Sequence, residues 1–254
     1  MRTRIDSVQA KVRRAEKHIR DLEAAVSEFT KTEPYKLGVR PNPQIPQLIQ
    51  AYICEAAEIP VEIPLICSDA IQNLRSALDH LVHQLVLACG NTPDRDTAFP
   101  VSIGPTEYGR ESQVKLKLVS PDAKKAIDDL KPYKGGNDLL WRLHKLNNLD
   151  KHRLLIAVGT SIAAIDAFSH WAKRVPQFAA FARHAFQFIP EDKMCPLKAG
   201  DVVFEDTQLN EGMKVTFHIA FGEPHVSNGE PMIFTLHEMA KLVRGIVSSF
   251  AQVL

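Results

Sequence analysis

A repeating apolar pattern at the start of the chain constrains the fold more than any other feature of the sequence. Apolar residues recur at alternating spacings of three and four: Ile5, Val8, Val12, Ala15, Ile19, Leu22, Val26 and Phe29. Because an α-helix turns once in about 3.6 residues, this spacing puts all of them on one face of a single long helix over residues 2–31. That face must be covered, either by the rest of the same chain or by a second copy.

The segments that follow, as far as residue 155, alternate between breaks and further helical patterns. Residues 32–46 are proline-rich and predict an extended connector, and residues 47–64 predict one or two short strands. Ser68 is a candidate cap for a helix that ends near Gly90. Residues 91–121 predict a loop, because prolines and glycines interrupt every regular pattern there. A short helix over 121–130 and a helix capped by Asn137 or Asp138 complete this part.

The remainder of the chain has the character of strands closed by a helix. Strands are predicted within 154–165, 201–205 and 214–221, and Asn228-Gly229 predicts a turn. Residues 162–188 are ambiguous, and residues 236–254 predict a helix. The sequence therefore predicts an α+β protein, mainly a helical bundle with a small antiparallel β portion in its C-terminal half. We expect residues 1–155 to form the bundle with a short strand insertion, and 156–254 to pack with it as one domain.

Composition and missing motifs exclude several classes of function. The 254 residues carry 31 basic and 30 acidic side chains, and this balance argues against a protein that binds duplex DNA over its surface. The sequence has no phosphate-binding loop, no dinucleotide fingerprint and no HExxH zinc motif, so no cofactor is expected. None of Cys54, Cys67, Cys89 and Cys195 forms a CxxC pair. Without a signal peptide or a long apolar run, the chain is expected to be cytoplasmic, with no membrane partner.

Two predicted helices carry the polar residues that are candidates for a functional site. One face of the helix over 68–90 presents Asn73, Ser76, His80 and His83, and Arg75 and Asp79 are spaced to pair on its flank. On the helix that starts near Asn137, the apolar stripe of Leu139, Leu143 and Leu146 continues into charged residues. The polar cluster at that end comprises Asn147, Asn148, Asp150, Lys151, His152 and Arg153. A simpler interpretation is a solvated helix end whose basic residues complement the helix dipole.

The segment from Arg75 to His80 has the form R-x4-H and resembles the signature of HEPN-domain ribonucleases. This resemblance implies a helical bundle of four or five helices, frequent dimerisation and RNA as substrate, in a bacterial toxin or defence system. It also implies that Arg75 and His80 form the catalytic pair, although Ser76 stands where family members usually have Asn, Asp or His. The stretches NLRSALDHL and LDKHR further resemble a broad group of bacterial proteins, a likeness that implies no activity.

A metal-independent endoribonuclease could be built from these residues. Histidine exchanges a proton near neutral pH, and arginine holds the scissile phosphate and its developing charge. His80 or His152 would move the proton, and Arg75 and Arg153 would bind the phosphate. The residues expected to bind or orient are Asn73, Asp79, His83, Asn147, Asp150 and Lys151.

Two other interpretations stay open. The first is a metal site in which Asp79, His80 and His83 face His144, Asp150 and His152, but the Glu-x-x-His pattern of di-iron bundles is missing. The second is non-enzymatic. Arg75, Asp79, Asp150 and Arg153 would form a structural ion network between the two helices, and the chain would be a binding or regulatory module.

Overall fold

The computed structural model describes residues 4–155, 157–162, 197–206, 216–223 and 225–252. Over these residues it contains six helices and two small antiparallel sheets, which confirms the predicted α+β class with a helical majority. The helices are α1 (Arg4–Lys31), α2 (Glu62–Ala88), α3 (Pro105–Lys115), α4 (Pro121–Asp129), α5 (Asp138–Asp150) and α8 (Met232–Ser249). The strands are β1 (Tyr35–Pro41), β2 (Ile49–Ala56), β3 (Ala157–Ile162), β4 (Val202–Asp206), β5 (Thr216–Glu223) and β6 (Ser227–Pro231).

The chain divides into two compact units, each assembled from separate parts of the sequence. Unit 1 comprises Met1–Glu23, Pro64–Leu155 and Ile233–Leu254, and unit 2 comprises Ala24–Ile63 and Ile156–Met232. In this division the chain changes unit after Leu155, and the closing helix α8 belongs to unit 1 and not to the segment that precedes it.

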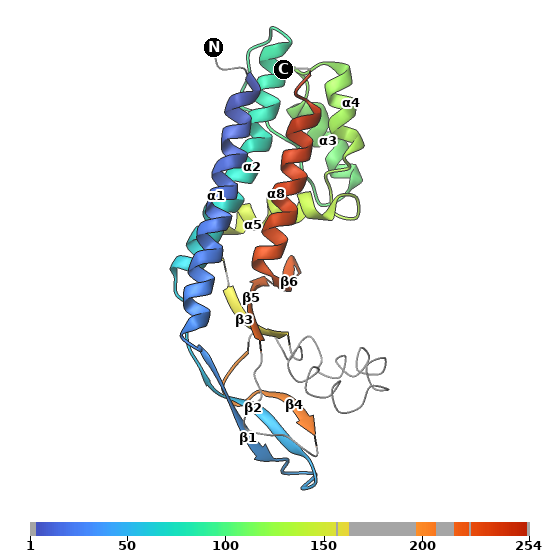
Figure 1. Ribbon diagram of the computed structural model, residues 1–254. Coiled ribbons are helices and arrows are strands. Elements are labelled where there is room, and N and C mark those ends of the chain that lie inside the picture. Colours follow the sequence, from blue (N-terminus) through green and yellow to red (C-terminus); the bar gives the residue numbers. More distant parts are fainter. Residues whose placement is uncertain (1–3, 156, 163–196, 207–215, 224, 253–254) are drawn as a thin grey trace, which may run out of the picture. The chain divides into compact units, whose positions relative to one another are not determined.

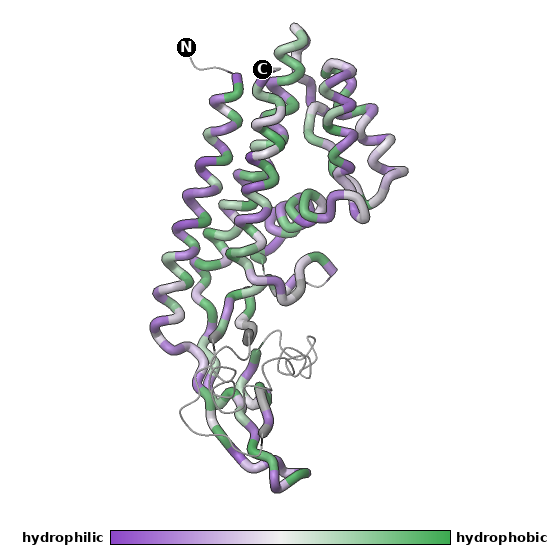
Figure 2. Tube along the Cα trace, turned by 45° about the vertical axis from the view of Figure 1, so that its right-hand side comes forward, coloured by the Kyte–Doolittle hydropathy of each residue, from purple (hydrophilic) through white to green (hydrophobic). Residues whose placement is uncertain are grey.

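Unit 1 is helical, and α1, α2 and α8 run alongside one another in it (Figure 1). An ion pair between Arg244 and Glu16, at 2.8 Å, and a hydrogen bond between His237 and Glu23, at 2.7 Å, join α8 to α1. The apolar seam predicted on α1 is buried from Val8 onward, and Figure 2 shows the alternation of hydrophobic and hydrophilic residues along this helix. The rest of the chain thus covers the seam, so burying it requires no second copy.

The core stripe predicted on α2 is confirmed, but the start of this helix is not. Ile71, Leu74, Leu78, Leu81 and Leu85 are all buried. The helix begins at Glu62 and not at Ser68, so residues 59–63 lead into its first turn instead of forming a strand. A proline at position 64 is compatible with this start, because the amide hydrogens of a first helical turn have no acceptor within the helix.

The segment 91–121, which the sequence predicts to be a loop, contains a helix, α3. Its first residue is Pro105, and a proline there starts a helix instead of breaking one. The helices α4 and α5 are confirmed, with side-chain caps from Ser120 and Asn137. The last helical residue of α5 is Asp150. The basic residues that follow it therefore lie beyond the helix end.

A polar cluster on Asp128 holds α3 against α4. Its carboxylate accepts hydrogen bonds from Tyr108 at 2.6 Å, from Ser112 at 2.8 Å and from Lys124 at 2.9 Å. Burial by itself raises the pKa of Asp128, but these three donors outweigh burial and the net shift is downward. The carboxylate therefore stays ionised and fixes the two short helices to each other.

Unit 2 contains the two sheets. The first has the order β1-β2-β4 and the second the order β3-β5-β6, with every pairing antiparallel. Strand β1 corrects the prediction of a connector over 32–46. Its proline, Pro41, is the last residue of an edge strand, where no ladder hydrogen bond is lost.

The predictions for the strands of the second half were mixed. The strands β3, β4 and β5 confirm those predicted within 154–165, 201–205 and 214–221, over the residues that the structure describes. Asn228-Gly229 is not the turn. Glu223 pairs with Ser227, so the chain reverses between those two residues and Asn228 already belongs to β6. The ambiguous segment 162–188 lies outside the described residues, apart from its first residue.

A small core in unit 2 forms around Tyr35. Tyr35 is buried with Ile53, Leu197 and Val203, and its ring lies 4.6 Å from that of Phe217 on β5. Its hydroxyl group occupies the space that a side chain would need at Gly159 on β3. Burial raises the pKa of Tyr35 above its ordinary value. The first strand of one sheet thus packs directly on the backbone of the other.

Replacing Gly159 with alanine should destabilise unit 2. The new methyl group would overlap the Tyr35 hydroxyl, and overpacking of this kind costs about 1–3 kcal/mol. We expect a lower melting temperature and a changed near-ultraviolet circular dichroism signal. Gly109→Ala in α3 is the matched control, because nothing lies within 4 Å of its added methyl group. Equal melting temperatures for the two variants would contradict the close packing of Tyr35 on Gly159.

Candidate functional site

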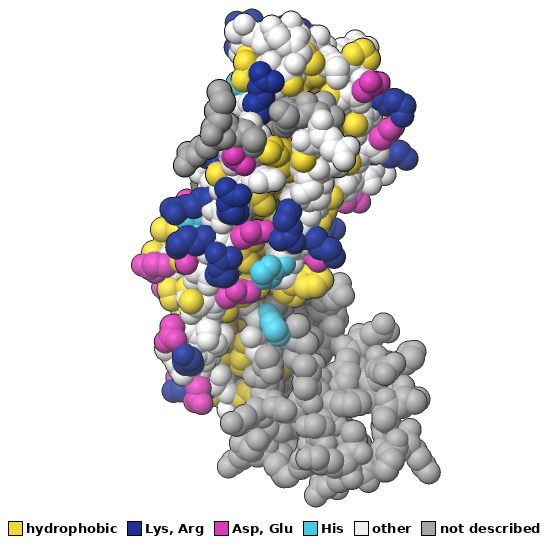
Figure 3. Space-filling model, turned by 45° about the horizontal axis from the view of Figure 1, so that its top comes forward, with side chains coloured by type: hydrophobic (Ala, Val, Ile, Leu, Met, Phe, Trp, Pro, Cys, Tyr) yellow, Lys and Arg dark blue, Asp and Glu magenta, His cyan; other side chains and the backbone are white. Residues whose placement is uncertain are grey.

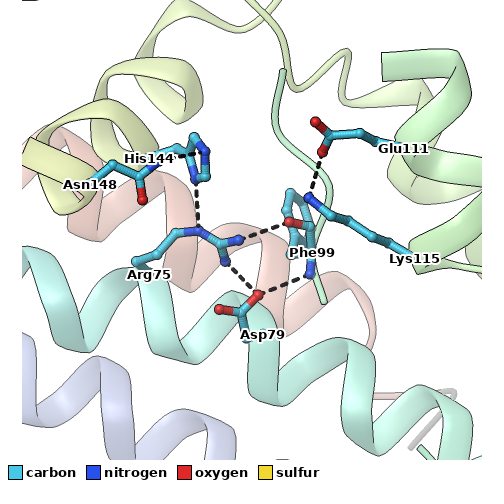
Figure 4. Close-up of polar contacts among 7 residues, drawn as sticks. All are labelled: Arg75, Asp79, Phe99, Glu111, Lys115, His144 and Asn148. Atoms are coloured by element: carbon cyan, nitrogen blue, oxygen red, sulfur yellow. Dashed lines mark hydrogen bonds and ion pairs between the residues drawn. The ribbon is translucent and has the colours of Figure 1, made fainter. Parts of the chain in front are cut away.

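Arg75 on α2 is the centre of the polar site in unit 1 (Figure 4). Its side chain is buried, and its guanidinium donates three hydrogen bonds to three different parts of the chain. The acceptors are Asp79 Oδ1 at 2.7 Å, the carbonyl oxygen of Phe99 at 2.8 Å and His144 Nδ1 at 3.3 Å. We refer to Arg75, Asp79, Phe99 and His144 together as the Arg75 clamp.

The clamp holds the backbone of Phe99 from both sides. Asp79 Oδ1 accepts the amide hydrogen of Phe99 at 3.0 Å, while Arg75 donates to the carbonyl oxygen of the same residue. The ion pair therefore replaces the partners that a neighbouring strand would provide for this extended segment. The Phe99 side chain is fully buried, so the two helical residues anchor a core residue through its main chain.

His144 on α5 is kept neutral by its surroundings. Burial lowers its pKa, the positive charges of Arg75 and Lys115 lower it further, and the result is about 4. Because arginine can only donate, His144 Nδ1 must accept, and the ring proton then lies on Nε2. The structure places the side-chain nitrogen Nδ2 of Asn148 3.0 Å from Nε2. With the ring proton on Nε2, this contact is a hydrogen bond once the Asn148 amide is turned so that its oxygen accepts.

This arrangement suits a structural role better than proton transfer. A histidine whose pKa is about 4 is a weak base at neutral pH, where a general base works best with a pKa near the operating pH. The guanidinium of Arg75 is already engaged on three sides by α2, α5 and the segment that carries Phe99. Beside the clamp, Lys115 pairs with Glu111 at 2.5 Å within α3 (Figure 4).

The structure brings Arg75 and Asp79 together but does not join Arg75 to His80. His80 is exposed, and the described hydrogen bonds of Arg75 lead elsewhere. Residues five apart on a helix point about 140° apart, which separates the two side chains. Burial lowers the pKa of His80, as do the positive charge of Lys11 on α1 and the neighbouring His83, while Asp79 opposes the shift. His80 thus lies near α1, whereas Arg75 faces α5.

The other candidates on α2 have simpler surroundings. His83 is exposed, one helical turn from His80. Asn73 donates from its side chain to the carbonyl oxygen of Asp69, one turn earlier in the same helix, at 2.8 Å. Ser68, expected to cap this helix, lies inside it and serves instead as a donor to α5.

The polar cluster at the end of α5 separates into an inner and an outer part. Asp150 accepts a hydrogen bond from Ser68 and so links α5 to α2, and Asn147 is buried. Burial, and then the charge of Asp150, raise the pKa of the neighbouring Cys67 thiol. Lys151, His152 and Arg153 are exposed beyond the helix end. Of the four-residue network proposed from the sequence, the described contacts include the Arg75–Asp79 pair, and Asp150 bonds to Ser68.

His144 and Asn148 are the site residues that sequence reasoning left without a role in this network. Their spacing of four places them on one face of α5, which is a signal available in the sequence. Arg75, which bonds to His144, is 69 positions away in the chain. Among the described residues, no group of three or more His, Cys, Asp or Glu side chains could hold a metal ion.

Comparison with known proteins does not assign the chain to a family. No family model matches the chain, and neither the curated proteins nor the solved structures contain a match. The HEPN resemblance, RNA as substrate and dimerisation therefore stay predictions. Within the described part of the chain, no helix has the length and apolar character needed to cross a membrane.

Removing the centre of the clamp should destabilise unit 1 strongly. Arg75→Ala would leave the Asp79 carboxylate, the Phe99 carbonyl and His144 without their shared donor, a loss of about 3–5 kcal/mol in the free energy of unfolding. Chemical denaturation measures this change in the free energy of unfolding. His80→Ala, on the same helix but exposed, is the control and should change the value by less than about 0.5 kcal/mol. Similar small effects for both variants would refute a structural clamp.

His144 should make stability depend on acid pH. The unfolded chain binds a proton at this residue near pH 6.5, whereas the folded protein binds it only near pH 4. Stability from this residue is therefore complete above pH 6.5 and is lost as the pH falls towards 4, by about 3 kcal/mol. In His144→Gln, whose amide oxygen can still accept from Arg75, the fall between pH 7 and 4 should be smaller. An unchanged fall would contradict a neutral His144.

Proposed function

We propose that this chain cleaves RNA without a metal ion and that His80, on the outer face of α2, is the proton-transferring residue. The observation that carries the proposal is an accessible imidazole with a second imidazole and a cation beside it. His80 is exposed, His83 lies one turn away on the same face, and Lys11 is close enough to act on the charge of His80. The HEPN resemblance supports RNA as the substrate.

These groups have the chemistry that such a cleavage needs. His80 removes the proton from the ribose 2′-hydroxyl, whose oxygen attacks the adjacent phosphorus, and the bond from phosphorus to the 5′-oxygen breaks. His83, in its protonated form, gives a proton to the leaving 5′-oxygen. Lys11 holds the charge that develops on the phosphate. The lowered pKa of His80 keeps it unprotonated, and so ready to act as a base, at neutral pH.

In this proposal Arg75 has a different role from the one inferred from its sequence motif. Its three hydrogen bonds hold α2 to α5 and to the Phe99 segment, and it does not contact the phosphate. Arg75 is therefore a positioning residue. Asp79 connects the two sides of α2, because it pairs with Arg75 and also acts on the charge of His80.

A second candidate function is a non-enzymatic binding or regulatory module. The occupied guanidinium of Arg75 favours it, since a buried ion pair of this kind can fix the register of two helices without any catalytic role. Under this alternative the exposed residues of α2 and α5 contact a partner, and RNA stays intact.

His80→Ala should abolish RNA cleavage by the purified protein. Loss of a general base lowers the rate by about 100-fold or more. Cleavage of a labelled RNA would be followed on gels, with chelator and with added Mg²⁺, and the rate should be the same in both. The wild-type rate should also rise with pH as His80 loses its proton and fall again at higher pH, because the base must be unprotonated and the acid protonated.

The matched control is His152→Ala, another exposed histidine of unit 1 and the alternative proton carrier inferred from the sequence. It should cleave at the wild-type rate. Activity lost in His152→Ala and kept in His80→Ala would assign the base to His152, just beyond the end of α5. RNA left intact by the wild-type protein under all conditions would reject cleavage in favour of the binding module.

A further inference from the structure

A concentration of basic side chains lies along one stretch of α1. Between positions 11 and 20 the sequence KVRRAEKHIR holds five lysines and arginines and one acidic residue. The seam residues among them, Val12, Ala15 and Ile19, are buried, so the charged side chains point outward. Figure 3 shows lysine and arginine side chains gathered on the face that α1 and α8 present. We call Lys11, Arg13, Arg14, Lys17 and Arg20 the α1 ridge.

Contacts with α8 leave this ridge positively charged. Glu16 and Glu23 each follow an arginine of the ridge by three positions, a spacing at which opposite charges can pair. Both glutamates are instead bonded to α8, Glu16 to Arg244 at 2.8 Å and Glu23 to His237 at 2.7 Å. Arg13 and Arg20 thereby lose their nearest acidic partners.

Three other lysines of unit 1 are paired with acidic residues of their own helices. On α4, Lys124 pairs with Asp128 and Lys125 with Asp129 at the i,i+4 spacing, and Lys115 pairs with Glu111 on α3. Of the ridge residues, Lys17 is paired, with Asp21, and within the described part of the chain no ion pair to another ridge residue is present. Among the described residues, Arg13, Arg14 and Arg20 form no ion pair. The protein has a formal net charge of only +1, so this is a local excess.

We propose that the α1 ridge binds the phosphate backbone of a single RNA strand. The inference rests on the proposed function and deepens it by assigning the surface that holds the substrate. Arg13, Lys17 and Arg20 share one face of the helix and extend about 10 Å along it, enough for two successive phosphates. Arginine suits this role because its planar group donates two parallel hydrogen bonds to a phosphate. Arg14 and then Lys11 continue the basic surface around α1 to the side of His80, whose charge Lys11 influences.

Binding can be measured separately from cleavage with a fluorescent 2′-O-methyl RNA, which has no free 2′-hydroxyl and cannot be cut. Arg13→Glu with Arg20→Glu should weaken its binding at least tenfold in fluorescence anisotropy. Arg13→Gln with Arg20→Gln should reduce the slope of log affinity against log salt by about 1.4, the value for two lost single-strand phosphate contacts. Thermal melting would check that the variants fold.

Arg110→Glu with Lys145→Glu is the matched control. Both side chains are exposed, on α3 and α5, and the double reversal changes the net charge by the same amount. It should leave RNA affinity within twofold of wild type. An equal loss in the control would overturn the proposal, because net charge alone would then explain binding. The proposal would also be overturned if the ridge variant no longer bound vesicles of anionic phosphatidylserine but still bound RNA as the wild-type protein does.

The two proposals fail in different ways. Wild-type protein that binds the 2′-O-methyl RNA through the ridge, but leaves ordinary RNA intact, would refute cleavage and support the ridge. Cleavage at the wild-type rate and RNA binding at the wild-type affinity in the ridge variant would refute the ridge and leave the role of His80 in place.

Discussion

The helical unit depends on a buried arginine that binds a peptide group instead of a ligand. A guanidinium removed from water costs several kcal/mol unless its hydrogen bonds are replaced. Arg75 replaces them with the Asp79 carboxylate, the Phe99 carbonyl and a neutral imidazole. The imidazole must stay neutral because a second positive charge would face the guanidinium. The pKa of His144, lowered to about 4, is thus a consequence of the clamp and a condition for it.

The features that followed from local rules could be predicted from the sequence. The α1 seam, the leucine stripe of α2 and the cap at Asn137 each depend on residues within a few turns of one another. The errors came where one residue type allows two structures. Pro105 and Pro64 lie in the first turns of helices, and Pro41 ends an edge strand. The sequence instead predicts a loop at Pro105, the end of a short strand at Pro64 and a connector at Pro41. Proline marks the boundary of an element without showing on which side the element lies.

The candidate site was predictable only in part, because its contacts join distant positions. The Arg75–Asp79 pair follows from a spacing of four, and the structure confirms it. No periodicity relates Arg75 to Phe99 or to His144, which lie 24 and 69 positions away. Tyr35 and Gly159 in unit 2 show the same limit, since a glycine kept free for a distant hydroxyl resembles any other glycine in a strand.

The R-x4-H pattern shows why a short motif does not determine a mechanism. Its two residues leave α2 on different sides, so one sequence signature contributes to two environments. Towards α5, Arg75 is buried and its donors are satisfied, which favours stability. Towards α1, His80 is exposed beside a cation, which favours chemistry on an anionic substrate. Asp79 acts on both sides, so a change in the clamp would also alter the charge environment of His80. The Asp79 carboxylate thus links Arg75, which stabilises the helical unit, to His80 on the candidate reactive surface.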